Sequence, residues 1–120
     1  MTLSEIRLRA RAQTGDRCAT DADDDALINA YVNEAQLLLY GEYAPEETQA
    51  LSGDGDVSAL PEAYHGALAD YGSYRLLGNS GLGAQQRSQY YHMRFELAQM
   101  QLRRHFERRA ARTRLGNKFN

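Results

Sequence analysis

The segment from Ala84 to Arg112 constrains the fold most, because its apolar residues recur at helical spacing over a long stretch without a proline. Both prolines of the chain, Pro45 and Pro61, come before it. At about 1.5 Å per residue, a helix over this segment reaches roughly 40 Å. A compact domain of 120 residues does not need so long a helix. The segment therefore predicts a helix that extends beyond the core.

This predicted helix carries two apolar stripes on nearly opposite sides. A single core readily covers only one of them. The other stripe packs under another element of the chain or against another subunit, and the pattern leaves both possibilities open. It also leaves open which stripe belongs to the core. The first stripe contains Tyr91, Phe95, Ala98, Leu102 and Phe106, and the second contains Tyr90, Met93, Leu97 and Met100.

Apolar spacing and capping residues predict three further helices. The first covers about 3–13, and Thr2 and Glu5 have the spacing of a capping box at its start. The second starts among the aspartates and ends at about residue 40. The third covers about 61–77, because a proline suits the first position of a helix.

The spacing also predicts which side chains of these helices face the core. Leu3, Ile6 and Ala10 form the apolar side of the first helix, so Arg7 is expected on its outside. Leu38 continues the apolar stripe of the second helix and is expected in the core.

Together these elements predict an all-α fold, a small bundle of about four helices with a long C-terminal helix and an extended C-terminal tail. One domain would cover residues 1–114, and residues 115–120 would form a docking tail. Residues 42–59 include the glycine- and aspartate-rich run 52–56, whose composition predicts a flexible loop.

The charges of the chain are distributed unevenly, although the net charge is only -2. Twelve acidic residues and one basic residue, Arg17, lie between positions 16 and 62. Seven basic residues and one acidic residue, Glu107, lie between positions 103 and 120. Such asymmetry indicates an assembly or a polyanionic partner.

The aspartates at 21, 23 and 25 match the first three ligand positions of an EF-hand calcium loop. The match ends there, because Ala26 stands where the turn needs glycine and Val32 stands where a bidentate glutamate belongs. Carboxylates at a helix N-terminus are stabilised by unpaired N–H groups and by the helix dipole. The cluster is therefore interpreted as a helix start.

No group of residues in the sequence has the spacing of a catalytic or metal site. His65, His92 and His105 lack zinc-ligand spacing, and Cys18 is the only cysteine. The glycine-rich segment 78–83 lacks the lysine of a phosphate-binding loop. We therefore expect no enzyme activity, no cofactor and no metal. We also expect no membrane association, since no apolar run approaches the roughly 20 residues of a membrane span.

The arginine-rich run 103–114 leaves two interpretations open. It could bind phosphates through its charge, as in a small helical nucleic-acid-binding regulator. It could instead be a solvated helix end, where cations favour the negative pole of the helix dipole. Beyond it, Leu115 and Phe119 could anchor the tail in a groove of a partner.

Four features together resemble the head-to-tail adaptor, or connector and head completion, proteins of tailed bacteriophages and related gene transfer agents. They are the start Met-Thr-Leu-x-Glu-x-Arg, the acidic helix start at 21–27, the segment Leu-Pro-Glu-x-Tyr-His-x-Ala-Leu-x-x-Tyr at 60–71, and the long closing helix that ends in arginines. The resemblance covers most of the chain. The order of the four features carries it, since each feature alone is ordinary helix chemistry.

The resemblance implies a structural virion protein that is made in the host bacterial cytoplasm and resides in the virion neck. It implies a homo-oligomeric ring, typically of twelve copies, between the portal protein and a tail or stopper protein. Double-stranded DNA would pass through the ring without sequence-specific binding. The C-terminal segment would dock on the portal through Arg112, Arg114, Leu115, Lys118, Phe119 and Asn120.

A ring also accounts for the charge asymmetry and for the second apolar stripe. In a closed ring, one face of a subunit meets a different face of the next, and opposite charges on the two faces fix the orientation. The predicted subunit interface contains Asp21, Asp23, Asp24, Asp25, Tyr90, Met93, Leu97, Met100, Arg104 and Arg108.

Overall fold

In the residues that it describes, the computed structural model contains four α-helices, and α3 is the central one, packed against the other three. The structure describes residues 1–15, 23–41, 43, 48–79 and 82–119, without the side chains of 23, 82 and 113–119. Within these residues there is no strand beyond one isolated bridge, so the predicted all-α bundle is confirmed. The elements in chain order are α1 (Leu3–Thr14), α2 (Asp23–Gln36), the π-helical η1 (Leu37–Gly41), the short 3-10 helix η2 (Glu62–Tyr64), α3 (His65–Gly78), η3 (Leu82–Ala84) and α4 (Gln85–Phe119).

Helix α1 begins and ends where its capping residues predict. The Glu5 backbone N–H donates to the Thr2 hydroxyl, and the Thr2 backbone N–H donates to the Glu5 carboxylate at 3.0 Å. Gly15 follows the helix at φ 68°, a left-handed conformation that glycine adopts without steric cost.

Arg7 on α1 is buried, which corrects the prediction that it faces outward. Its side chain is only 9% exposed. The guanidinium donates to the Asn29 side-chain oxygen at 3.1 Å and forms ion pairs with Asp25 and Asp54. These acceptors come from two other segments of the chain and compensate the charge of Arg7. The apolar spacing along α1 alone could not reveal them.

The segment after α2 also differs from the prediction, because a π-helical stretch replaces the last turn of a regular helix. The wider i→i+5 turn rotates the side chains relative to the α-helical spacing. Leu39 and Tyr40 are buried, whereas Leu38 is 48% exposed. Leu38 therefore does not belong to the core, contrary to the sequence-based expectation.

Residues 48–59 are held against the bundle, although their composition predicts a flexible loop. The Asn33 side chain donates to the Leu51 carbonyl at 2.9 Å and accepts from the Leu51 N–H at 2.7 Å. The Asp56 carboxylate accepts from the N–H groups of Ser52 and Gly53, both at 2.8 Å. The Leu3 N–H donates to the Asp56 carbonyl at 2.8 Å. These bonds satisfy the backbone of the loop. Of the remaining residues of the predicted loop, 42–47, the structure describes only Tyr43.

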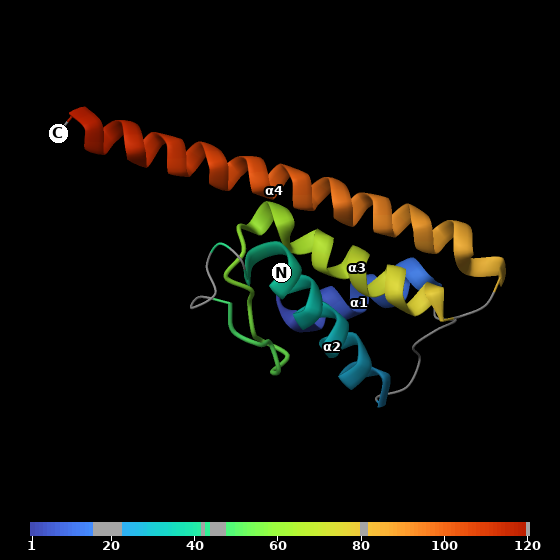
Figure 1. Cartoon of the computed structure of the whole chain (residues 1–120). Coiled ribbons are helices and arrows are strands. Elements are labelled where there is room, and N and C mark those ends of the chain that lie inside the picture. The colour runs from blue at the N-terminus through green and yellow to red at the C-terminus, as the bar shows by residue number, and fades with distance from the viewer. Residues whose placement is uncertain (16–22, 42, 44–47, 80–81, 120) are drawn as a thin grey trace.

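Helix α4 lies along α3 and uses its first apolar stripe for the core (Figure 1). Phe95 and Leu102 are buried, and the Phe106 ring stacks on Tyr40 and Tyr43 with centroids 5.5 and 4.6 Å apart. The second stripe is exposed. The structure therefore answers which stripe is core.

The C-terminal part of α4 continues past the body of the molecule (Figure 1), whose longest dimension is 56 Å. The described side chains from Glu107 to Arg112 are all exposed. The helix continues to Phe119, so residues 115–119 are helical and do not form the predicted extended tail. Gly116 destabilises a helix by only about 1 kcal/mol relative to alanine, so this residue alone does not end α4. The predicted boundary at 114 lies inside the helix.

The two stripes of α4 predict different stability effects for the same substitution. Leu102→Ala should lower the free energy of unfolding by about 2–5 kcal/mol, because it leaves a cavity in the core. Leu97→Ala on the exposed stripe should change it by about 0.5 kcal/mol or less in dilute solution. Urea unfolding followed by circular dichroism measures both. Equal losses for the two variants would contradict the assignment of the core stripe.

Candidate functional site

The exposed stripe of α4 is a line of four large apolar side chains that the described part of the bundle leaves uncovered. We call it the outer stripe, and it consists of Tyr90, Met93, Leu97 and Met100. Each of these residues is 51–68% exposed, on the side of α4 opposite the buried Phe95 and Leu102. In Figure 1 no described element lies on that side of α4. Two methionines make this surface adaptable to the shape of a partner.

The second feature of α4 is a groove near its projecting end, which we call the basic groove. Its volume is about 650 Å³, and its lining contains no acidic residue. Arg104, Arg108 and Arg112 follow one another at four-residue spacing along one side of the helix. None of these three forms an ion pair with a described residue. The groove is lined by Tyr64, Gln101, Arg104, His105, Arg108, Arg109 and Arg112.

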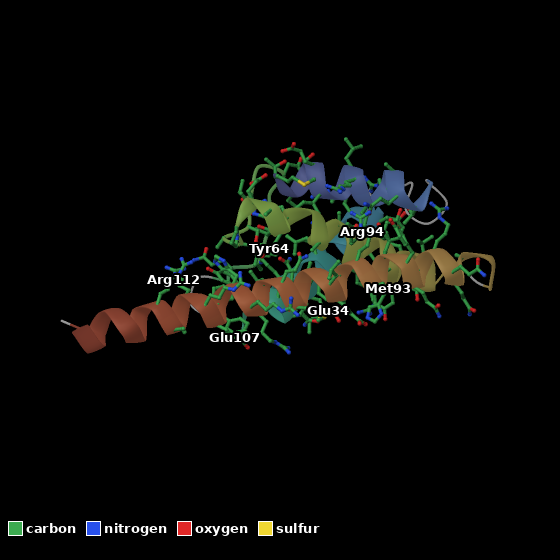
Figure 2. All side chains as sticks on the ribbon, turned by 90° about the horizontal axis from the view of Figure 1, so that it is seen from above. Glu34, Tyr64, Met93, Arg94, Glu107 and Arg112 are labelled. Atoms are coloured by element: carbon green, nitrogen blue, oxygen red, sulfur yellow. The ribbon has the colours of Figure 1, made fainter. Side chains whose placement is uncertain are left out.

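Tyr64, just ahead of α3, forms the wall of the basic groove opposite α4. Figure 2 shows Tyr64 beside α4 and Arg112 farther along the same helix. The four-residue spacing of the arginines is visible in the sequence, and it could have indicated a charged face. The contribution of Tyr64 could not have been found in this way, because it depends on how α3 and α4 pack.

A polar network around Asp70 ties α4 to α1 and α3. The Asp70 carboxylate lies 3.2 Å from the Arg94 side chain and accepts from the Gln13 side chain at 3.2 Å. The Gln13 side-chain oxygen in turn accepts from the Ser73 hydroxyl at 2.7 Å. Burial raises the pKa of Asp70, although Arg94 and Gln13 oppose this effect. Asp70 on α3 thus has partners on α1 and α4, so this carboxyl links the three helices.

The described residues offer little for catalysis or metal binding. They contain no group of three histidine, cysteine, aspartate or glutamate side chains that could hold a metal ion. The buried His65 ring contacts the Leu60 carbonyl at 2.7 Å, and His92 contacts Glu96 on its own helix at 3.1 Å. None of the helices in the described part of the chain is both long and apolar enough to cross a bilayer. The predicted absence of enzyme activity remains a prediction.

The predicted interface aspartates have different surroundings. Asp25 forms ion pairs with Arg7 and Arg11 of its own chain, so its charge needs no arginine from a second copy. Asp24 also has an interaction within the chain. Asp23 begins α2, but its side chain lies outside the described residues, as does all of Asp21. The outer stripe, Arg104 and Arg108 are exposed members of the predicted subunit interface.

The predicted portal-docking residues all follow the last core contact of α4. Arg112 is exposed at the basic groove. Arg114, Leu115, Lys118 and Phe119 lie on the helical backbone, with side chains outside the described part. Asn120 lies outside it entirely. The helical backbone from 112 to 119 thus projects as one segment.

Asp70 predicts a distinctive dependence of stability on pH. Because its pKa is raised in the folded state, that state binds the proton more tightly, and ionisation lowers stability as the pH rises from the ordinary carboxyl pKa through the folded-state value. Asp70→Asn cannot ionise. Its stability relative to the wild type should therefore rise with pH across this window, as measured by urea unfolding at a series of pH values.

Asp56→Asn provides a control of opposite sign for this measurement. N–H donors from Ser52 and Gly53 lower the pKa of Asp56. Its ionisation therefore contributes stability that is lost as the pH falls through the folded-state pKa, and the variant should lose stability relative to the wild type as the pH rises. The same sign for both variants would contradict the assignment for Asp70.

Comparisons of the chain with known protein families, with curated proteins and with solved structures found no match. The resemblance to phage head-to-tail adaptors therefore remains a prediction from the sequence. The geometry itself places an exposed apolar stripe and a basic groove along one helix, α4.

Proposed function

We propose that this protein is a structural subunit that assembles into a ring, as a head-to-tail adaptor between the portal and the tail of a phage. The observation that carries the proposal is the second apolar stripe of α4, which stays uncovered while the first stripe forms the core. Contiguous apolar surface of this kind marks interaction sites in soluble proteins. The sequence resemblance supplies the particular assembly.

The charges around the outer stripe support a contact with a neighbouring subunit. Arg104 and Arg108 continue the line of the stripe toward the projecting end, and neither has an ion-pair partner among the described residues. A ring contact that buries the stripe would leave these arginines at its rim. Rim charges set orientation and association rate more than affinity.

The projecting end of α4 supports docking on a second partner, the portal. Core contacts end at Phe106, and the described side chains from Glu107 to Arg112 are all exposed. An amphipathic helix that extends from a body can lay its apolar residues into a groove of a partner. In the proposed assembly the ring encloses double-stranded DNA, which passes without sequence-specific binding.

The docking role predicts the effect of a short C-terminal deletion. A chain lacking residues 115–120 should fold and melt like the full chain, because the deletion removes no described core contact. It should lose attachment to portal particles, measured by co-sedimentation. Attachment and particle assembly at the wild-type level would contradict a docking role of this segment.

The runner-up function is a nucleic-acid-binding regulator that uses the basic groove on phosphates, and duplex DNA binding separates the two. The adaptor should bind duplex DNA weakly at physiological salt, as measured by fluorescence anisotropy. The regulator would bind with an affinity that falls steeply as salt increases, and Arg108→Glu would reduce the logarithmic slope by about 0.9 for each lost phosphate contact. Arg103→Glu, outside this groove, is the matched control.

A further inference from the structure

The spacing of the outer stripe is that of a short coiled-coil seam. Its four residues are separated by three, four and three positions, which places them at alternating a and d positions of two heptads. Met93 and Leu97 are the central pair, and Tyr90 and Met100 flank them symmetrically. A stripe with this symmetry can pack against an identical stripe that runs in the opposite direction.

We propose that two copies of this protein pair through their outer stripes as an antiparallel, two-fold dimer of α4 helices. Met93 of one copy packs on Leu97 of the other, and Tyr90 packs on Met100. All four apolar residues of each copy are then covered. This dimer does not depend on the proposed ring, and it adds a state in which the same surface is occupied before any ring forms.

The charges of α4 select the antiparallel orientation. Arg104 continues the heptad register of the stripe, so a parallel pair would place it against its own copy, near two further arginines at 103 and 108. Like charges held together in this way disfavour the pair. The antiparallel pair places Arg104 beside the uncharged Gln86 and carries the two arginine-rich ends in opposite directions.

The residues beside the seam are compatible with this pairing. In the antiparallel register Glu96 faces Glu96 of the second copy, and Arg94 faces Arg94. In its own chain Arg94 lies 3.2 Å from the Asp70 carboxylate, and this opposite charge reduces the repulsion between the two Arg94 side chains. The Glu96 side chain is 56% exposed, so salt and water screen the contact between its two copies.

The rest of the molecule does not obstruct the pair. Each residue of the outer stripe is more than half exposed, so α3 does not cover it, although Leu97 and Met100 also line grooves between α4 and the bundle. The two bundles would therefore lie on opposite sides of the helix pair. Four apolar residues per copy form a small interface, below the roughly 1,200 Å² of stable complexes, so the dimer is reversible and depends on concentration.

Disulfide cross-linking of the full chain tests the orientation directly, with Cys18→Ser in every variant. Tyr90→Cys combined with Met100→Cys should give covalent dimers under mild oxidation, whereas either substitution alone should not. In the antiparallel pair, position 90 faces position 100, and the two positions 90 lie about ten residues, or roughly 15 Å, apart. Disulfides need Cα atoms within about 7 Å.

Each other result overturns part of the proposal. Dimers from the single variants would show a parallel pair. An absence of dimers from the double variant, with circular dichroism and melting like those of the parent, would show that the stripe does not pair with itself. The two cysteines of one chain cannot form a disulfide with each other, because ten residues along one helix separate them by roughly 15 Å.

Sedimentation velocity of cysteine-free chains provides a second measurement. Leu97→Glu should raise the dimer dissociation constant roughly tenfold or more, because it places a charge in the seam. Leu8→Glu, an equally drastic change at an exposed leucine of α1, should leave the dimer unchanged. An unchanged dimer in Leu97→Glu would overturn the proposal. Portal binding without any dimer would refute the dimer alone, and a dimer without portal binding would refute the adaptor function alone.

Discussion

The packing of α4 on α3 is the interaction on which the rest of the structure depends. The ring centroids of Phe95 and Tyr71 are 4.8 Å apart, and the buried Leu102 follows two turns later on α4. Helix α4 packs its apolar contacts on the bundle through this stripe, with α3 as its main neighbour, and Arg94 adds a polar contact to Asp70. Once that stripe is buried, the opposite stripe must face away from the bundle, and the helix beyond Phe106 must project. The interaction surface thus follows from how the core is built.

The arginines divide into two groups that explain how the charge asymmetry is used. Several arginines of the bundle form ion pairs within the chain, as Arg7 and Arg11 do with Asp25, and as Arg75 does with Glu34 at 2.8 Å. The acidic first half is therefore partly neutralised by the bundle itself. The ion pairs of these carboxylates do not include Arg104, Arg108 or Arg112 of the basic groove. In the folded chain, the uneven charge of the sequence therefore gives one exposed basic end rather than two faces of opposite charge.

Local signals predicted the helices well, and contacts between distant segments explain what they missed. The capping box at Thr2 and the two stripes of α4 depend on residues a few positions apart, so the sequence contains them. The burial of Arg7, the anchoring of Leu51 by Asn33 and the part of Tyr64 in the basic groove each depend on a partner far along the chain. Spacing also could not choose between two stripes of similar apolar character, since that choice depends on which one α3 accommodates.

An uncovered stripe on a helix that also carries the core has a consequence for assembly. The same four residues cannot contact two partners at once, so any complex that buries them competes with any other. A partner that displaces a self-paired copy must offer more than the four apolar contacts that the pair already provides. The projecting basic end supplies such an addition, because the self-paired stripe does not include it and it can engage a template first. Assembly would then begin on the template, where the added contacts outweigh the loss of the pair, and a small self-pairing interface makes that exchange fast.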